Sequence, residues 1–154
     1  MRIMIIGAGH VGLSSAVVLA EHHKVTVVEI DEFRVDQIRN GIAPILELGL
    51  EPLLKSAILE HGMQVIGIHD NISPQDVVFI CVNTPSMDDG SVDLADLVAS
   101  LEYIQGKSKT LIKDHILFVV RSTIPPGTTR SVVMNHLLEL KSTGSISLIY
   151  QPEF

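Results

Sequence analysis

The chain begins with a strand, a glycine-rich turn, a helix and a second strand. The turn, Gly7 to Gly12, directly follows an apolar run at residues 2–6 and opens a helical pattern over residues 11–22. A second apolar run, residues 25–29, ends in the acid Glu29. This order predicts a βαβ unit, and the glycine spacing matches a turn that binds a dinucleotide.

Each glycine of the turn has a separate physical task. Gly7 lets the chain turn tightly out of the strand, Gly9 lets the backbone approach a pyrophosphate, and Gly12 lets the helix lie close to the sheet. The first amides of the helix lack intrahelical partners and carry the positive end of the helix dipole, so they favour a phosphate. The turn therefore predicts a pyrophosphate site.

Glu29 lies about 20 residues beyond the glycines, where the dinucleotide fingerprint places a partner of the adenosine ribose. Its carboxylate would accept hydrogen bonds from both ribose hydroxyls, and its charge would repel a 2′-phosphate. The sequence therefore favours NAD over NADP. A methyltransferase that binds S-adenosylmethionine remains an alternative, because it also combines a glycine turn with an acid at the end of the second strand.

Apolar runs and helical patterns alternate along the rest of the chain. We expect strands near residues 2–6, 25–29, 64–68, 77–82, 116–121 and 146–150, and helices near residues 11–22, 32–40, 50–61, 93–105 and 128–141. Most strands are rich in Val and Ile without polar alternation, which is typical of strands covered on both faces. The pattern predicts one α/β domain over residues 1–154, a doubly wound parallel six-stranded sheet (Rossmann fold) in three α/β/α layers, with strand order 3-2-1-4-5-6.

The link at residues 69–76 is too short for a full crossover helix, although Ser73-Pro74 could support a single turn. Tyr103 and Lys107 have the spacing of the Tyr-x-x-x-Lys pair of short-chain dehydrogenases. We interpret that pair as coincidence, because Gly106 lies inside it and the expected helix ends near it.

Composition argues against several other classes of protein. The formal net charge of −7 disfavours general nucleic-acid binding, and no apolar run reaches the roughly 18 residues that cross a bilayer. Cys81 is the only cysteine, so we expect no internal disulfide, a reducing cytoplasm, and a thiol packed at the end of a buried strand. The seven histidines lack ligand spacing, and no metal site is expected.

Polar segments that contain proline follow the last three expected strands. They occupy residues 81–85, 121–129 and 151–154. Ligands of open parallel sheets bind beyond the carboxyl ends of the strands, and loops there carry function more often than core positions do. We therefore expect these three segments to line a ligand crevice together with the glycine turn.

On these motifs the chain resembles the amino-terminal domain of the UDP-glucose/GDP-mannose dehydrogenase family over residues 1–154. The loop at residues 40–45 (Asn-Gly-Ile-Ala-Pro-Ile) and the terminal Pro152-Glu153-Phe154 are not general Rossmann features, so together they make the resemblance specific. The further motifs that carry it are Gly7 to Leu13, Glu29 to Arg34, Thr84-Pro85, Ser122-Thr123 and Pro126-Gly127-Thr128-Thr129.

Members of this family oxidise the primary alcohol of a nucleotide sugar to a carboxylate. They use two NAD molecules in succession and pass through a thioester on a cysteine. The resemblance therefore implies NAD as the cofactor, a nucleotide sugar as the substrate, and a homo-oligomer for a longer protein. Which sugar nucleotide is used stays open, because the family's base and sugar contacts lie beyond residue 154.

The resemblance also implies roles for single residues. It assigns the cofactor to the glycine turn and to three further side chains: Gly7, Gly9, His10, Val11, Gly12, Glu29, Arg34 and Thr84. It places Thr123 near the nicotinamide, where it contacts the cofactor and helps to position a water or the reacting oxygen. It brings Glu153 toward the sugar carbon that is oxidised, in support of acid–base and hydrolysis steps.

The chain departs from the family in several places. The family often has an aromatic residue where His10 stands, usually Asp where Glu29 stands, and commonly Lys where Arg121 stands. Its nucleophilic cysteine lies beyond residue 154, and Cys81 does not match it. We therefore expect an excised cofactor domain that binds NAD without turnover. An NAD-binding sensor module and the cofactor domain of another dehydrogenase stay open as alternatives.

Overall fold

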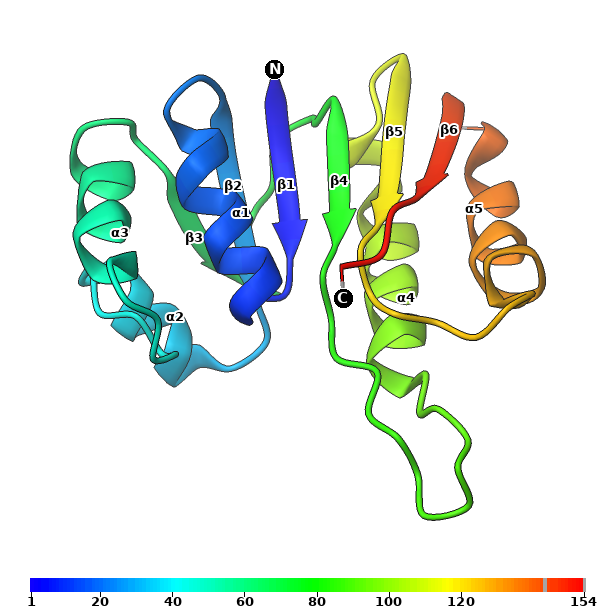
Figure 1. The fold of residues 1–154 in the computed structure, drawn as a ribbon. Coiled ribbons are helices and arrows are strands. Elements are labelled where there is room, and N and C mark those ends of the chain that lie inside the picture. The colour runs from blue at the N-terminus through cyan, green and yellow to red at the C-terminus, as the bar shows by residue number, and fades with distance from the viewer. Residues whose placement is uncertain (143, 154) are drawn as a thin grey trace.

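The structure, a computed structural model, describes residues 1–142 and 144–153, and its centre is a six-stranded parallel sheet (Figure 1). The strand order is β3-β2-β1-β4-β5-β6, as the sequence predicts. All six strands lie where they were expected, within two residues at each end: β1 (Arg2–Ile6), β2 (Lys24–Glu29), β3 (Gln64–Gly67), β4 (Val77–Ile80), β5 (His115–Val120) and β6 (Ser145–Tyr150).

The central strands β1, β2, β4 and β5 are mostly buried on both faces, which explains why they lack polar alternation. The edge strand β6 alternates Ser with Ile and Leu and is largely exposed. Successive side chains of a strand point to opposite faces. Accordingly, Ile3 and Ile5 of β1 belong to one buried cluster, while Met4 and Ile6 belong to the other.

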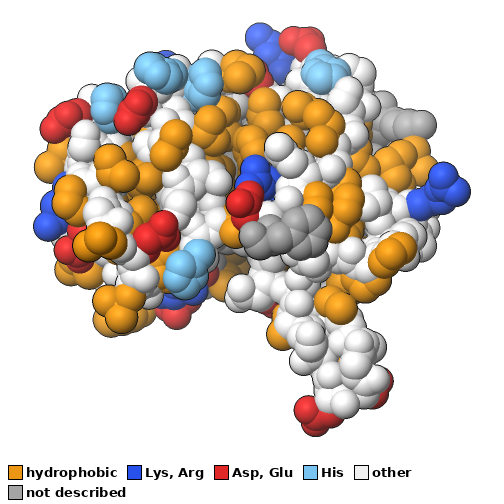
Figure 2. Space-filling view, in the orientation of Figure 1, with side chains coloured by type: hydrophobic (Ala, Val, Ile, Leu, Met, Phe, Trp, Pro, Cys, Tyr) orange, Lys and Arg blue, Asp and Glu red, His pale blue; other side chains and the backbone are white. Residues whose placement is uncertain are grey.

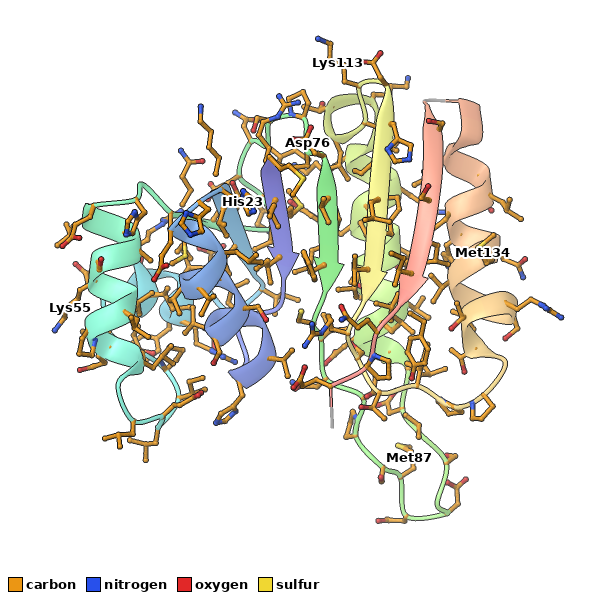
Figure 3. The ribbon with its side chains drawn as sticks, turned by 45° about the horizontal axis from the view of Figure 1, so that its top comes forward. His23, Lys55, Asp76, Met87, Lys113 and Met134 are labelled. Atoms are coloured by element: carbon orange, nitrogen blue, oxygen red, sulfur yellow. The ribbon has the colours of Figure 1, made fainter. Side chains whose placement is uncertain are left out.

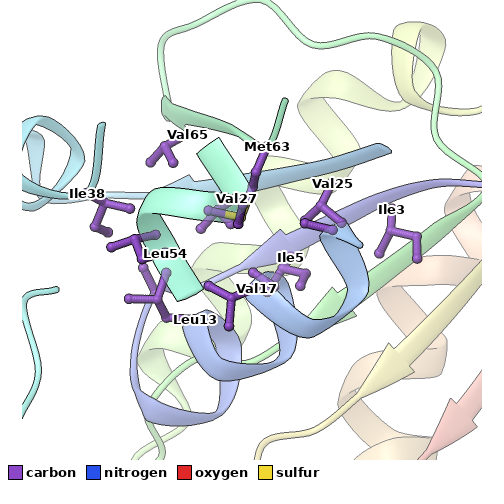
Figure 4. Close-up of a cluster of buried hydrophobic side chains, with 14 of the residues drawn as sticks. Ile3, Ile5, Leu13, Val17, Val25, Val27, Ile38, Leu54, Met63 and Val65 are labelled. Carbon is purple, nitrogen blue, oxygen red and sulfur yellow. The ribbon is translucent and has the colours of Figure 1, made fainter. Parts of the chain in front are cut away.

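Helices cover the two faces, and the doubly wound three-layer architecture is confirmed (Figure 1). One face packs against α1 (His10–Ala20), α2 (Glu32–Arg39) and α3 (Leu50–Leu59), and the other against α4 (Ala95–Leu111) and α5 (Met134–Leu138). Figure 4 shows the first cluster, where Leu13, Val17 and Leu54 pack against Val27 and Ile5. The helix face changes between β1 and β4, where the strand order reverses.

The helices of the described residues leave part of the sheet bare. In Figure 1, α1 lies in front of β1 and β2, whereas no helix lies in front of β4, β5 or β6. After β6 the chain end passes the carboxyl end of β5 toward the end of β4. The site described below opens onto the bare face. None of the described helices is long and apolar enough to cross a membrane.

Two helices differ from the expectation. The fourth helix continues to Leu111, so Tyr103 and Lys107 lie inside it and the expected end near residue 105 is wrong. The Lys107 Nζ lies 5.9 Å from the centre of the Tyr103 ring, within cation–π range. The expected helix at 128–141 is helical but divided into η1 (Thr129–Val133, a π-helix), α5 and η2 (Glu139–Ser142, a 3₁₀ helix).

The link between β3 and β4 carries no helix, as its length predicts. Its turn falls at Ile68 and His69 instead of Ser73-Pro74. The backbone amide of Asp76 then donates to the carbonyl of Arg2, which aligns β4 beside β1. Ile68 and Ile72 of the link pack against the second buried cluster, so the link itself helps to cover that face of the sheet.

Candidate functional site

The glycine turn is as tight as its sequence predicts. Gly7 has a φ of +97°, and a Cβ there would lie 2.6 Å from the Cys81 carbonyl oxygen. A Cβ on Gly12 would overlap the carbonyl oxygen of Gly7. Gly9 differs, because nothing lies within 4 Å of the position that its Cβ would take. The backbone at Gly9 is therefore open to a ligand that approaches closely.

The start of α1 offers free donors beside this opening. Gly9 is its N-cap and supplies no side-chain cap, so the first amides of the helix are left for another acceptor. The dipole adds positive character at the same end. His10 and Val11, the first residues of the helix, border a hollow at this point. The residues present thus fit a pyrophosphate group.

Glu29 is nearly buried at the carboxyl end of β2, with 6 % of its surface exposed. Its Oε2 accepts from the amide of Ala8 at 3.2 Å, and its Oε1 accepts from the amides of Ile30 at 2.8 Å and Asp31 at 3.1 Å. The carboxylate therefore joins the glycine turn to the end of β2. Since Oε1 already accepts two bonds, Oε2 has more capacity left for a ligand hydroxyl.

Arg34 lies against the same turn. Asp31 caps α2 by accepting from the amides of Phe33 and Arg34. An Nη atom of Arg34 donates to the Ala8 carbonyl at 2.8 Å, and its other Nη lies 3.8 Å from Glu29 Oε2. The structure thus brings Glu29 and Arg34 together at the glycine turn, as the sequence predicts.

Hydrogen bonds join the segments after β4, β5 and β6. Thr84 Oγ1 donates to the Thr123 carbonyl at 2.7 Å, and Thr123 Oγ1 donates to the Glu153 carbonyl at 3.2 Å. Ser122 Oγ adds a bond to the Val82 carbonyl at 2.7 Å. The structure therefore gathers Thr84, Thr123 and Glu153 at one edge of the sheet. Phe154, the last residue of the resemblance motif, lies outside the described residues.

Arg121 is a site residue that the sequence interpretation left out. Its side chain is only 16 % exposed and forms an ion pair with Glu153. Its Nη1 also donates to Gln151 Oε1 at 3.4 Å. The available signal was its position, because Arg121 directly precedes Ser122 at the carboxyl end of β5.

A hollow of about 730 Å³ connects the start of α1 with these strand ends (Figure 2). Glu47 also lines this hollow, where its Oε2 accepts a hydrogen bond from Ser14 Oγ at 3.0 Å. The lining residues that carry charge or a hydrogen-bonding group are His10, Ser14, Ser15, Glu47, Arg121, Gln151 and Glu153.

Cys81 is buried directly after β4, and its expected packing role is confirmed. Burial raises the pKa of the Cys81 thiol to about 12, against a smaller lowering by the charge of Arg121. The thiol is therefore protonated at neutral pH and is a poor nucleophile. Its carbonyl instead forms the wall against which Gly7 turns.

A second hollow lies at the opposite edge, where the strands begin. Figure 3 shows His23 and Asp76 at this end of the molecule, and both border the hollow. Three histidines line it, yet no group of three or more His, Cys, Asp or Glu side chains among the described residues could hold a metal ion. Arg2 pairs with Asp76 there at 3.3 Å, which joins β1 to the start of β4.

Comparison with known proteins agrees with this geometry. The family model described as "UDP-glucose/GDP-mannose dehydrogenase family, NAD binding domain" matches residues 1–154. The chain is 34 % identical to UDP-glucose 6-dehydrogenase YwqF of Bacillus subtilis over 100 % of its own length and 34 % of that protein. It is 38 % identical to UDP-N-acetyl-D-mannosamine dehydrogenase of Methanococcus maripaludis over 85 % of its own length and 30 % of that protein.

Solved structures show the same likeness. A UDP-glucose dehydrogenase from Pyrobaculum islandicum superposes with a TM-score of 0.89 at 30 % identity, covering 99 % of this chain and 36 % of that one. A ternary complex of a GDP-mannose dehydrogenase from Pseudomonas aeruginosa gives a TM-score of 0.85 at 31 % identity, covering 100 % and 36 %. The chain therefore spans about a third of the length of these relatives.

Proposed function

The chain belongs to the UDP-glucose/GDP-mannose dehydrogenase family as its NAD-binding domain, and we propose that it serves a longer, homo-oligomeric enzyme that oxidises a nucleotide sugar. One observation above all supports the assignment of the cofactor site. Glu29 and Arg34 meet the glycine turn at Ala8, beside the open backbone of Gly9. An acid, a cation and free helix amides thus surround a place where no protein side chain stands.

We assign the adenosine half of NAD to this region. The amides at Gly9, His10 and Val11 receive the pyrophosphate, with Gly7 and Gly12 shaping the turn that presents them. The free capacity of Glu29 Oε2 accepts a hydroxyl of the adenosine ribose, and Arg34 flanks that ribose. The buried charge of Glu29 disfavours a 2′-phosphate, which accounts for NAD in preference to NADP.

Residues at the ends of β4 and β5 would hold the nicotinamide half of NAD. Thr84 and Thr123, which a hydrogen bond joins there, would contact the cofactor, and Thr123 would help to position the reacting oxygen or a water near the ring. Glu153 exchanges a proton with that oxygen, and its half-exposed carboxylate leaves room for substrate. When bound, NAD supplies the hydride acceptor, and the residues of this chain orient the reacting groups around it.

We further propose that the 154-residue chain alone binds NAD without completing the reaction. A covalent route to a carboxylate needs a nucleophile, and the one cysteine of the chain is buried and protonated. Sustained NADH production by the purified chain with UDP-glucose or GDP-mannose would overturn this part of the proposal.

The cofactor assignment is tested by calorimetric titration of the chain with NAD, with NADP and S-adenosylmethionine as controls. We expect saturable binding of NAD and much weaker binding of NADP. Binding of S-adenosylmethionine with indifference to NAD contradicts the proposal and favours a methyltransferase.

A further inference from the structure

Glu153 lies in a segment with no regular secondary structure, and its side chain is 53 % exposed. Two backbone contacts place the main chain at this point. Thr123 Oγ1 donates to the Glu153 carbonyl at 3.2 Å, and the Glu153 amide donates to the Arg121 carbonyl at 3.3 Å. Neither contact restrains the carboxylate, so the side chain has several rotamers available. Holding it in one rotamer costs conformational entropy.

Arg121 is the group that restrains this carboxylate. Within the part of the chain that the structure describes, Glu153 has one ion-pair partner, an Nη atom of Arg121. The guanidinium is itself held, because its side chain is mostly buried and its other Nη bonds Gln151. A planar fork with both ends occupied is a preorganised partner that directs a carboxylate.

The hollow around this pair contains further titratable side chains. Glu47 and His10 line the same hollow, and Ser14 already bonds Glu47. Among the described residues that line the hollow, Arg121 is the one Lys or Arg, and it pairs with Glu153.

We propose that Arg121 is a positioning residue for the reaction: it holds the Glu153 carboxylate at the nicotinamide end of the crevice before substrate arrives. The inference rests on the proposed function, and it adds a residue to which that function assigned no role. Exposed ion pairs contribute at most about 1 kcal/mol, so the effect lies in where Glu153 is held more than in global stability.

The test is NMR of the Glu153 side chain in the ¹³C-labelled chain, with and without NAD, because contacts that do not involve the Arg121 side chain hold the main chain. The variants are Arg121→Met, which removes the charge, and Arg121→Lys, which retains a point charge that can still pair with Glu153. Arg130→Met is the matched control, because Arg130 is exposed and has no ion pair among the described contacts. Thermal unfolding confirms that each variant is folded.

In the wild type and in Arg121→Lys, we expect ordered methylene groups in the Glu153 side chain and a carboxyl carbon resonance that shifts when NAD binds. In Arg121→Met, we expect the order parameters of these methylene groups to fall and the response of the carboxyl carbon to NAD to be lost, while the Glu153 amide stays ordered. The Kd for NAD changes less than about fivefold, in line with about 1 kcal/mol. Arg130→Met behaves as the wild type does.

Two results overturn the inference while NAD binding stands. One is an Arg121→Met chain whose Glu153 side chain keeps its order and its response to NAD. The other is an Arg121→Lys chain that loses both, since retained charge then fails to rescue the position. A wild-type chain that does not bind NAD at all is a different failure, because it removes the proposed function and the inference with it.

Discussion

At the scale of single residues, Glu29 combines a structural task with its proposed ligand task. Its carboxylate accepts three backbone amides, from Ala8, Ile30 and Asp31, and in doing so holds the glycine turn beside β2. Hydrogen bonds to a charged group contribute more than neutral ones, and buried amides that lose their acceptor carry a desolvation penalty. Substitution of Glu29 should therefore change both stability and affinity.

We expect Glu29→Ala to weaken NAD binding by about 1.5–3 kcal/mol, the range for hydrogen bonds to a charged group. The melting temperature should fall as well, because three amides lose their acceptor. Calorimetric titration and thermal unfolding measure the two effects. Glu102→Ala, at an exposed acid of α4, is the control and should change neither. Unchanged NAD affinity in Glu29→Ala would remove Glu29 from the site.

Cys81 makes the free energy of unfolding depend on pH in the alkaline range. Burial raises its folded-state pKa from about 9.0 to about 12, so the folded state holds its proton longer than the unfolded chain does. The stabilisation is fully present below pH 9.0 and is lost as the pH rises toward 12. The contribution amounts to about 1.4 kcal/mol per pH unit in that window.

Urea unfolding between neutral pH and pH 10.5 (about the middle of that window) measures this dependence. The free energy of unfolding should fall more steeply for the wild type than for Cys81→Ala. Burial also raises the pKa of Tyr103, but that contribution is present in both proteins and cancels in the comparison. Parallel curves for the two proteins would mean that the thiol is not desolvated in the folded state.

At the scale of elements, the two helical glycines have opposite surroundings. Gly106 lies inside α4, and nothing lies within 4 Å of the position that its Cβ would take. Gly12 lies inside α1, where a Cβ would overlap the Gly7 carbonyl. One glycine is thus required by close packing of a helix on the glycine turn, whereas the other only lowers the helix propensity of its element.

Gly106→Ala should stabilise the chain by about 0.5–1 kcal/mol, because alanine restricts the unfolded chain and fits the helix. This corresponds to a rise in melting temperature of a few degrees for a chain of this size. Gly12→Ala is the matched comparison and should destabilise the chain and weaken NAD binding together. A destabilising Gly106→Ala would show that α4 is packed more closely at that position than the structure indicates.

At the scale of the whole molecule, a single sheet joins two hydrophobic clusters. Ile5 faces the cluster under α1 and α3, and Ile80 faces the cluster under α4 and α5. Both side chains are fully buried. Because the clusters share every central strand, loss of packing on one face of the sheet should also destabilise the other face.

We therefore expect Ile5→Ala and Ile80→Ala each to lower the free energy of unfolding by about 2–5 kcal/mol. Each variant should unfold in one cooperative transition, with coincident curves from circular dichroism and tyrosine fluorescence. Leu59→Ala, at an 81 % exposed position of α3, should stay within about 0.5 kcal/mol of the wild type. Separate transitions for the two faces would contradict the assignment of residues 1–154 to one domain.

The sequence by itself determined the order of the strands, the glycine turn and the family. Apolar runs, helical periodicity and glycine spacing are local patterns, and each is complete within a few residues of the chain. They located β1 to β6 and predicted that the segments after β4, β5 and β6 share one edge. The glycine fingerprint also placed Glu29 beside the turn, and the family resemblance added Arg34; the structure has both there.

The tertiary structure alone decided which side chains meet at that edge. Thr84 bonds a residue 39 positions away, and Arg121 pairs with one 32 positions away. Such contacts depend on strand register, on where the chain end runs after β6, and on side-chain rotamers, none of which a local pattern records. For the same reason, only the fold could bring Glu47 into the hollow beside Arg121 and leave the front of β4 to β6 bare.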